Sequence, residues 1–133
     1  MIRSATVEDM PRLLAWGKAF HKASGQPFRF DPVAVEGFLT GLMGNGAVIV
    51  SDTGMIGGVL SPAYCDPEWI MAVELFWWAE RDGLALLRAF EDWAAERGAS
   101  EVRMTSLAAL PRADGILRRK GYAPAEISYQ KVI

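Results

Sequence analysis

The sequence predicts a single domain of the α/β class (α+β type), with elements in the order β-α-α-β-β-β-α-β-α-β. Along the chain, segments in which apolar residues recur at every second position alternate with segments in which they recur every three to four positions. The chain has 133 residues and is 51% hydrophobic, which suits one packed core. No linker, repeat or block of charge divides residues 1–133, so we expect one domain.

One strand and two helices are predicted before residue 47. Residues 2–5 read as a short strand, and Thr6 is placed to cap a helix that runs to about residue 23. Asp31 followed by Pro32 is typical of an N-cap and first helical turn, so a second helix is expected from there to the Gly-Asn-Gly stretch at 44–46.

Three strands are predicted next. Residues 47–51 are rich in β-branched side chains, and the turn at 52–54 connects them to a strand over 55–61. The pair Gly57-Gly58 indicates a bulge or a close approach of two backbones. Residues 70–78 form the following strand.

The remaining elements are two helices and two strands. A helix is expected from Gly83 to about residue 97, where Gly98 ends it, and a strand over 101–105 follows. Pro111 precedes a helix over 112–120 that Gly121 terminates. Residues 125–133 read as a last strand.

Charge and composition exclude several classes of function. The net charge of −2 gives no basic excess for binding nucleic acid, and no stretch is long and apolar enough to cross a membrane. The N-terminus lacks the apolar core of a signal peptide, so we expect a soluble, cytoplasmic protein. One cysteine, Cys65, and one histidine, His21, allow no internal disulfide and no Cys/His metal cluster, so no metal is predicted.

Six short phrases occur together in an order typical of one known family. They are Ile2-Arg3-Ser4-Ala5-Thr6 with Asp9 and Met10, Gly54-Met55-Ile56-Gly57-Gly58, Glu74-Leu75-Phe76-Trp77, Gly83-Leu84-Ala85-Leu86-Leu87, Trp93-Ala94 with Gly98, and Lys120-Gly121-Tyr122. Through these phrases essentially the whole chain resembles the GNAT superfamily, the general control non-repressible related N-acetyltransferases. The Phe-Trp-Trp strand and the short tail look most like the compact members found among phages and prophages.

The resemblance implies a fold and a co-substrate. The fold has a mixed central sheet of six or so strands flanked by four helices, and the fourth strand splays from the fifth to admit the pantetheine arm of acetyl-CoA. The pyrophosphate lies on amides at the N-terminus of the third helix, where free N–H groups and the helix dipole favour anions. On this chain the implied acetyl-CoA-binding residues are Leu75, Phe76, Trp77, Arg81, Asp82, Gly83, Leu84, Ala85 and Leu86.

Two acidic residues near this region allow alternative interpretations. The resemblance makes Glu74 the general base that deprotonates the acceptor amine, whereas strand alternation alone equally allows Glu74 to face solvent. Asp82 belongs to the implied phosphate loop, but it is also a natural N-cap whose carboxylate would occupy the helix amides. In the family, the phosphate loop begins with Gln or Arg three residues before its first glycine, and this chain has Glu80 at that position.

The implied function is transfer of an acetyl group from acetyl-CoA to a primary amine of a small molecule or peptide, by direct attack. The family's usual general acid is a tyrosine, and this chain has Leu117 at that position. A catalytically inactive protein that binds CoA or another protein is therefore the alternative. The short C-terminus leaves room for one strand after Gly121, and an open sheet edge would favour a homodimer.

Overall fold

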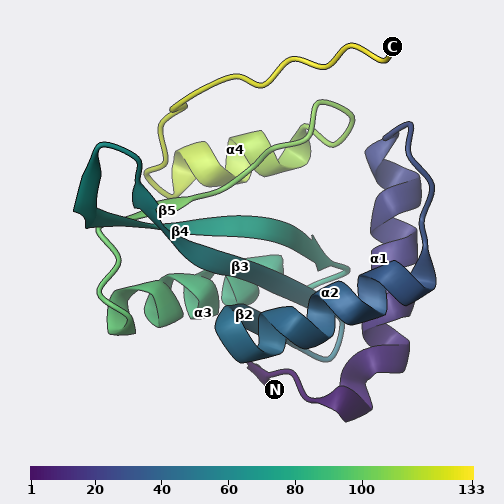
Figure 1. The fold of residues 1–133 in the computed structure, drawn as a ribbon. Helices are drawn as coiled ribbons and strands as arrows, with labels where there is room; N and C mark the ends of the chain where they lie inside the picture. The colour runs from purple at the N-terminus through teal and green to yellow at the C-terminus, as the bar shows by residue number, and fades with distance from the viewer.

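A five-stranded sheet forms the centre of the protein in the computed structural model, which describes residues 1–133 (Figure 1). The strands lie side by side in chain order: β1 (Arg3–Ser4), β2 (Ala47–Val50), β3 (Gly54–Ala63), β4 (Asp66–Ala79) and β5 (Glu101–Arg103). The first four strands are antiparallel, and β5 runs parallel to β4. The predicted fold class is confirmed.

Four α-helices surround the sheet, as predicted. They are α1 (Met10–Ser24), which follows a short 3-10 turn (Val7–Asp9), α2 (Pro32–Asn45), α3 (Gly83–Glu96) and α4 (Arg112–Arg119). None of them combines the length and the apolar composition that a membrane-crossing helix needs.

The predicted start of α2 and the predicted stops after α3 and α4 act as expected, whereas Thr6 precedes only the 3-10 turn and the N-cap of α1 is Asp9. The Asp31 carboxylate accepts hydrogen bonds from the N–H groups of Val33 and Ala34, at 3.1 and 3.3 Å, and so caps α2. Gly98 and Gly121 have φ angles of 77° and 90°, a region that favours glycine, and they follow the ends of α3 and α4.

Two apolar clusters pack on the sheet. One joins α1 and α2 to the sheet through Leu13, Leu39 and Phe76, and the other joins α3 to it through Ile56 and Phe90. Figure 1 shows α3 lying below the sheet and α4 lying next to β5. Burial of these side chains is the main force that holds the helices on the sheet.

A bulge interrupts the pairing of β3 with β4. Gly57 pairs with Phe76 and Gly58 pairs with Glu74, so Leu75 is an extra residue on β4. A β-carbon on Gly58 would lie 2.7 Å from the Phe90 ring, which leaves no room for a larger residue there. The prediction of a bulge and a close backbone approach at these two glycines is confirmed.

Beyond the bulge, one edge of β4 is open. β4 pairs with β5 only at Met71, Ala72 and Val73, and after Arg103 the chain leaves the sheet. Residues 74–79 therefore have β3 on one side and no strand on the other. This divergence of β4 from β5 is the splay that the family resemblance implies.

The C-terminal segment differs from the prediction. Residues 123–133 form no strand, and their side chains are exposed. β5 offers only three paired residues, and Pro124 has no N–H to donate, so little extended edge is available for another strand. An ion pair from Arg103 to Glu126 and a hydrogen bond from Gln130 to Gln26 connect this segment to the rest of the chain. β5 is an edge strand, and the homodimer expected from an open edge stays a prediction.

Candidate active site

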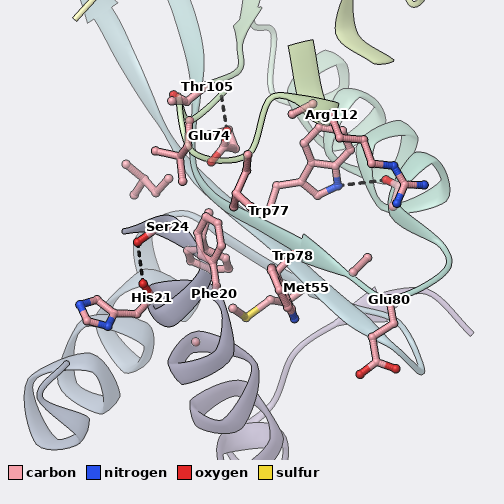
Figure 2. A pocket seen from close by; sticks show the side chains of 18 of the residues that line it. Phe20, His21, Ser24, Met55, Glu74, Trp77, Trp78, Glu80, Thr105 and Arg112 are labelled. Atoms are coloured by element: carbon pink, nitrogen blue, oxygen red, sulfur yellow. Dashed lines mark hydrogen bonds between the residues drawn. The ribbon is translucent and has the colours of Figure 1, made fainter. Parts of the chain in front are cut away.

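A cavity of about 1040 Å³ opens where β4 diverges from β5. Its walls come from α1, the α1–α2 connector, α2, the open part of β4, the loop before α3, the first turn of α3, the segment after β5, and α4. Figure 2 shows Glu74 beside Thr105, with Phe20 and Trp78 below them. The same opening therefore joins the N-terminal helices to the start of α3.

Glu74 is a buried carboxyl group in this cavity. Its side chain is only 6% exposed, so the solvent-facing interpretation is wrong. The bulge at Leu75 breaks the two-residue alternation on which that interpretation depended. Burial raises the pKa of Glu74 to about 7, and the N–H of Thr105, which donates to Oε1 at 2.9 Å, opposes that rise. A carboxyl group with a pKa near 7 is suited to proton transfer at neutral pH.

The N-terminus of α3 presents backbone N–H groups without a side-chain cap. The first helical hydrogen bond runs from the N–H of Leu86 to the carbonyl of Asp82, so the N–H groups of Gly83, Leu84 and Ala85 have no partner within the helix. Helix N-termini of this kind bind anions.

Asp82 does not occupy these amides, so of the two interpretations open from the sequence the N-cap role of its carboxylate is wrong. Its Oδ1 accepts hydrogen bonds from Ser51 Oγ at 2.8 Å and from Thr53 Oγ1 at 2.6 Å, across the β2–β3 turn. Burial acts to raise the pKa of Asp82, but the hydrogen bonds from Thr53 and Ser51, together with a backbone hydrogen bond and the nearby charge of Arg81, hold the pKa below its usual value. The carboxylate is thus used to tie the start of α3 to the sheet.

Three arginines line the cavity. Arg81 comes from the loop before α3, and Arg112 and Arg119 come from α4. Arg118, their neighbour on α4, instead pairs with Asp114 at 2.9 Å and does not line the cavity. Glu80 is also a lining residue, but it is exposed and points away from Glu74 in Figure 2. Cations and free amides together suit a phosphate-bearing ligand.

The two adjacent tryptophans of β4 face opposite sides of the sheet, as alternation predicts. Trp77 packs with the α3 cluster, and its indole N–H donates to the carbonyl of Gly83 at 3.0 Å. Trp78 packs with the α1–α2 cluster, against Phe20 at a ring separation of 5.7 Å. Trp77 thereby fixes the first turn of α3 against β4.

Most of the predicted acetyl-CoA-binding residues meet in this cavity. Its lining includes Leu75, Phe76, Trp77, Arg81, Asp82, Gly83, Leu84 and Ala85. Leu86 is the exception, because its side chain is fully buried in the α3 cluster and its N–H is bonded within the helix.

Sequence reasoning missed an aromatic wall on the other side of Glu74. Phe28 and Phe30, from the connector between α1 and α2, line the cavity together with Phe38 of α2 and His21 of α1. The density of phenylalanine between residues 20 and 38, including two in a connector, was a signal that could have pointed to this wall.

No tyrosine lines the cavity. Tyr122 donates a hydrogen bond to Glu91 on α3 at 2.7 Å, and burial together with that acceptor raises the pKa of Tyr122. Tyr64 and Tyr129 are exposed, and Leu117 is buried in α4. The single cysteine, Cys65, is exposed in the turn between β3 and β4 and is not part of the cavity.

Several solved structures with the same fold are acetyltransferases by name, and one, from Bacillus halodurans C-125, is named as a transcriptional regulator (TM-score 0.74 at 17% identity, covering 100% of this chain and 99% of that one). A ribosomal-protein-alanine N-acetyltransferase from Brucella melitensis biovar Abortus 2308 superimposes with a TM-score of 0.79 at 14% identity, covering 100% of this chain and 98% of that one. A putative acetyl transferase from Pyrococcus furiosus superimposes with a TM-score of 0.76 at 18% identity, covering 100% of this chain and 99% of that one. An aminoglycoside acetyltransferase from an uncultured soil metagenomic sample, in complex with sisomicin, gives 0.73 at 15% identity, with coverages of 100% and 95%.

These likenesses establish that the chain has the fold of the GNAT acetyltransferases over its whole length. No family model matches the sequence, and no curated protein matches it. At identities below 20% the comparison concerns the fold, and a function must be argued from the site.

Proposed function

We propose that this protein is an N-acetyltransferase that moves an acetyl group from acetyl-CoA to a primary amine by direct attack, with Glu74 as the general base. The observation that carries the proposal is the position of Glu74. A buried carboxyl group with a pKa of about 7 lies in one cavity with the uncapped amides of α3 and three arginines. The narrower likeness to compact phage and prophage members and the cytoplasmic location stay predictions.

The residues present fit acetyl-CoA. The amides of Gly83, Leu84 and Ala85 suit the pyrophosphate, because the Asp82 carboxylate is turned to Ser51 and Thr53. The open edge of β4 at residues 74–79 offers backbone groups to the amide-containing pantetheine arm. When bound, acetyl-CoA supplies the acetyl group as an activated thioester.

Glu74 supplies the proton transfer that the acceptor needs. An alkylamine is mostly protonated at neutral pH and attacks only after it loses a proton. The Glu74 carboxylate takes one proton from the ammonium group. The neutral amine nitrogen then attacks the acetyl carbonyl carbon, an N–C bond forms and the C–S bond breaks, and the second proton leaves the nitrogen for the departing thiolate, so that CoA is released as the thiol. We assign no side chain as general acid, because a thiol has a pKa near 8.5 and its thiolate can therefore leave without first being protonated.

Acetyl-CoA binding and turnover test the proposal directly. Acetyl-CoA at 100 times its dissociation constant is expected to stabilise the fold by about 2.7 kcal/mol, which a thermal-shift titration measures. Release of the CoA thiol on addition of amines is then followed with a thiol reagent. Absence of any shift at millimolar acetyl-CoA contradicts the proposal.

The adjacent arginines of α4 provide a matched pair. Arg119→Gln is expected to raise the dissociation constant of acetyl-CoA about 10-fold, because Arg119 lines the cavity and charge-assisted contacts to phosphates are strong. Arg118→Gln removes the same charge from the same helix, but Arg118 pairs with Asp114, so no change is expected. Calorimetry measures both values, and equal effects would remove Arg119 from the binding site.

A second candidate is a catalytically inactive protein with this fold that binds CoA. The absence of any tyrosine from the cavity favours this candidate, because a tyrosine is the general acid that the family resemblance implies. Binding of acetyl-CoA without release of its thiol, for every amine tested, would select this candidate.

A further inference from the structure

The part of the cavity that lies towards α1 and α2 is walled by aromatic rings. Phe20, Phe28, Phe30 and Phe38 line it together with Trp78. Phe28 and Phe38 remain 62% and 50% exposed although they face a cavity. Phe20 and Trp78 are in contact at a centroid separation of 5.7 Å, so part of the wall is already packed and the rest is available to a ligand.

The polar side chains of this wall are already engaged within the protein. Ser24 Oγ donates to the carbonyl of His21 at 2.7 Å, and the Gln26 side chain accepts a hydrogen bond from Gln130. The Nε2 atom of His21 is in contact with the carbonyl oxygen of Phe28. What the wall offers a ligand is therefore apolar and aromatic surface.

Charge is confined to the other part of the cavity. None of the lining residues between positions 13 and 39 is Lys, Arg, Asp or Glu. The charged lining residues are Glu74, those of the loop before α3, and Arg112 and Arg119 of α4. Glu74 is the one buried carboxylate among these lining residues, which suits a ligand with a single ammonium group.

We infer that the acceptor is a small arylalkylamine, that is, a primary amine carried on an aromatic body with one positive charge. This inference rests on the proposed function. The aromatic body lies against Phe28, Phe38 and Trp78, and its ammonium group is directed to Glu74. Aromatic faces attract a cation as well as an apolar ring, so they hold both parts of such a molecule. A polyamine would leave its additional cations without carboxylate partners.

A panel of amines tests the substrate class. With saturating acetyl-CoA, kcat/KM for 2-phenylethylamine is expected to exceed kcat/KM for spermidine, and for the peptide Gly-Ser-Ala amide, by about 30-fold, because burying the ring contributes binding that the others lack. Thiol release measures each value. A kcat/KM for spermidine or the peptide that equals or exceeds that for 2-phenylethylamine would overturn the inference while leaving acetyl transfer itself established.

Two substitutions on α2 locate the acceptor. Phe38→Ala is expected to raise the KM for 2-phenylethylamine about 10-fold and to leave the KM for acetyl-CoA unchanged, since half of the ring is exposed in the cavity and its loss leaves the core intact. Val33→Ala, on the same helix but 80% exposed and outside the cavity, is the control and leaves both values unchanged. Equal amine KM values for wild type and Phe38→Ala would also overturn the inference.

Direct binding separates this inference from the proposed function. If no amine is acetylated, calorimetry of 2-phenylethylamine and spermidine with the wild-type protein still decides the class of ligand. Tighter binding of 2-phenylethylamine by 10-fold or more would support the aromatic site without catalysis. Equal binding, or tighter binding of spermidine, would reject it.

Discussion

Glu74→Gln is expected to lower kcat/KM by about 100-fold to 10,000-fold, the range typical of losing a general base. Glutamine has nearly the same shape and still accepts the hydrogen bond that the Thr105 N–H donates to Oε1 at 2.9 Å. It cannot take a proton, so binding of acetyl-CoA is expected to be unchanged while turnover falls. Steady-state kinetics and calorimetry check the two halves of this prediction, and unchanged turnover would remove Glu74 from the mechanism.

The pH dependence expected of the wild-type protein follows from the same group. Because burial raises the pKa of Glu74 to about 7, the carboxylate form needed of a base is mostly absent below that pH. We expect kcat/KM to rise through pH 7 as Glu74 loses its proton. In Glu74→Gln the inflection near pH 7 should disappear, which leaves only the rise that follows deprotonation of the amine itself, and persistence of that inflection would assign it to another group.

Glu74 is also expected to make stability depend on pH, in the direction opposite to that of an ion-paired carboxylate. Its pKa is about 7 in the folded protein and 4.5 when solvated, so between these values the folded state binds more protons than the unfolded state. The free energy of unfolding therefore falls as pH rises from 4.5 to 7. Glu74→Gln should be more stable than wild type by about 3 kcal/mol above pH 7, with the difference lost below pH 5. Urea denaturation at pH 5 and pH 8 measures it.

Phe90→Ala is the substitution expected to cost the most stability, about 3–5 kcal/mol, because it opens a cavity in a fully buried part of the core. The ring of Phe90 packs under Gly58, at the bulge that positions Glu74, and stacks on Trp93 at 5.4 Å. Because the ring is closely packed on both sides, the neighbouring side chains cannot move far enough to fill the cavity, and the loss of stability is not reduced. The melting temperature is expected to fall by roughly 10–20 °C.

Phe38→Ala is the matched control for this prediction. It removes the same atoms from a ring that is 50% exposed, so a loss below about 1 kcal/mol is expected. Thermal unfolding of the two variants and the wild type gives the comparison. Similar losses for Phe90→Ala and Phe38→Ala would show that α3 does not anchor the core beneath the bulge.

Several features of the fold could be predicted because they depend on local interactions. The Asp31-Pro32 start of α2 and the glycine stops after α3 and α4 need only neighbouring residues to act, and the structure confirms them. The apolar periodicity likewise identified the elements that surround the cavity. The choice of Glu74 as candidate base came from a family resemblance, and the structure adds its burial and its contact with Thr105.

Other features could not be predicted because they depend on residues far apart in the chain. The sequence left open whether the Asp82 carboxylate caps α3, and the hydroxyl groups of Ser51 and Thr53 hold it away from the helix amides. The segment 125–133 has the alternation of a strand, but a strand forms only where an edge is available to pair with it, and β5 is too short to provide one.

Local patterns along the chain were sufficient to predict the α/β class, the order of the elements through β5 and α4, and which residues stand at the start of α3. Only the tertiary structure decided that Glu74 is buried, that the α3 amides are uncapped, and that aromatic rings from α1, α2 and their connector face the same cavity. The physical reason is that periodicity and caps are short-range properties of the chain. Burial, pKa and the shape of a cavity arise from side chains that meet only after the helices pack on the sheet.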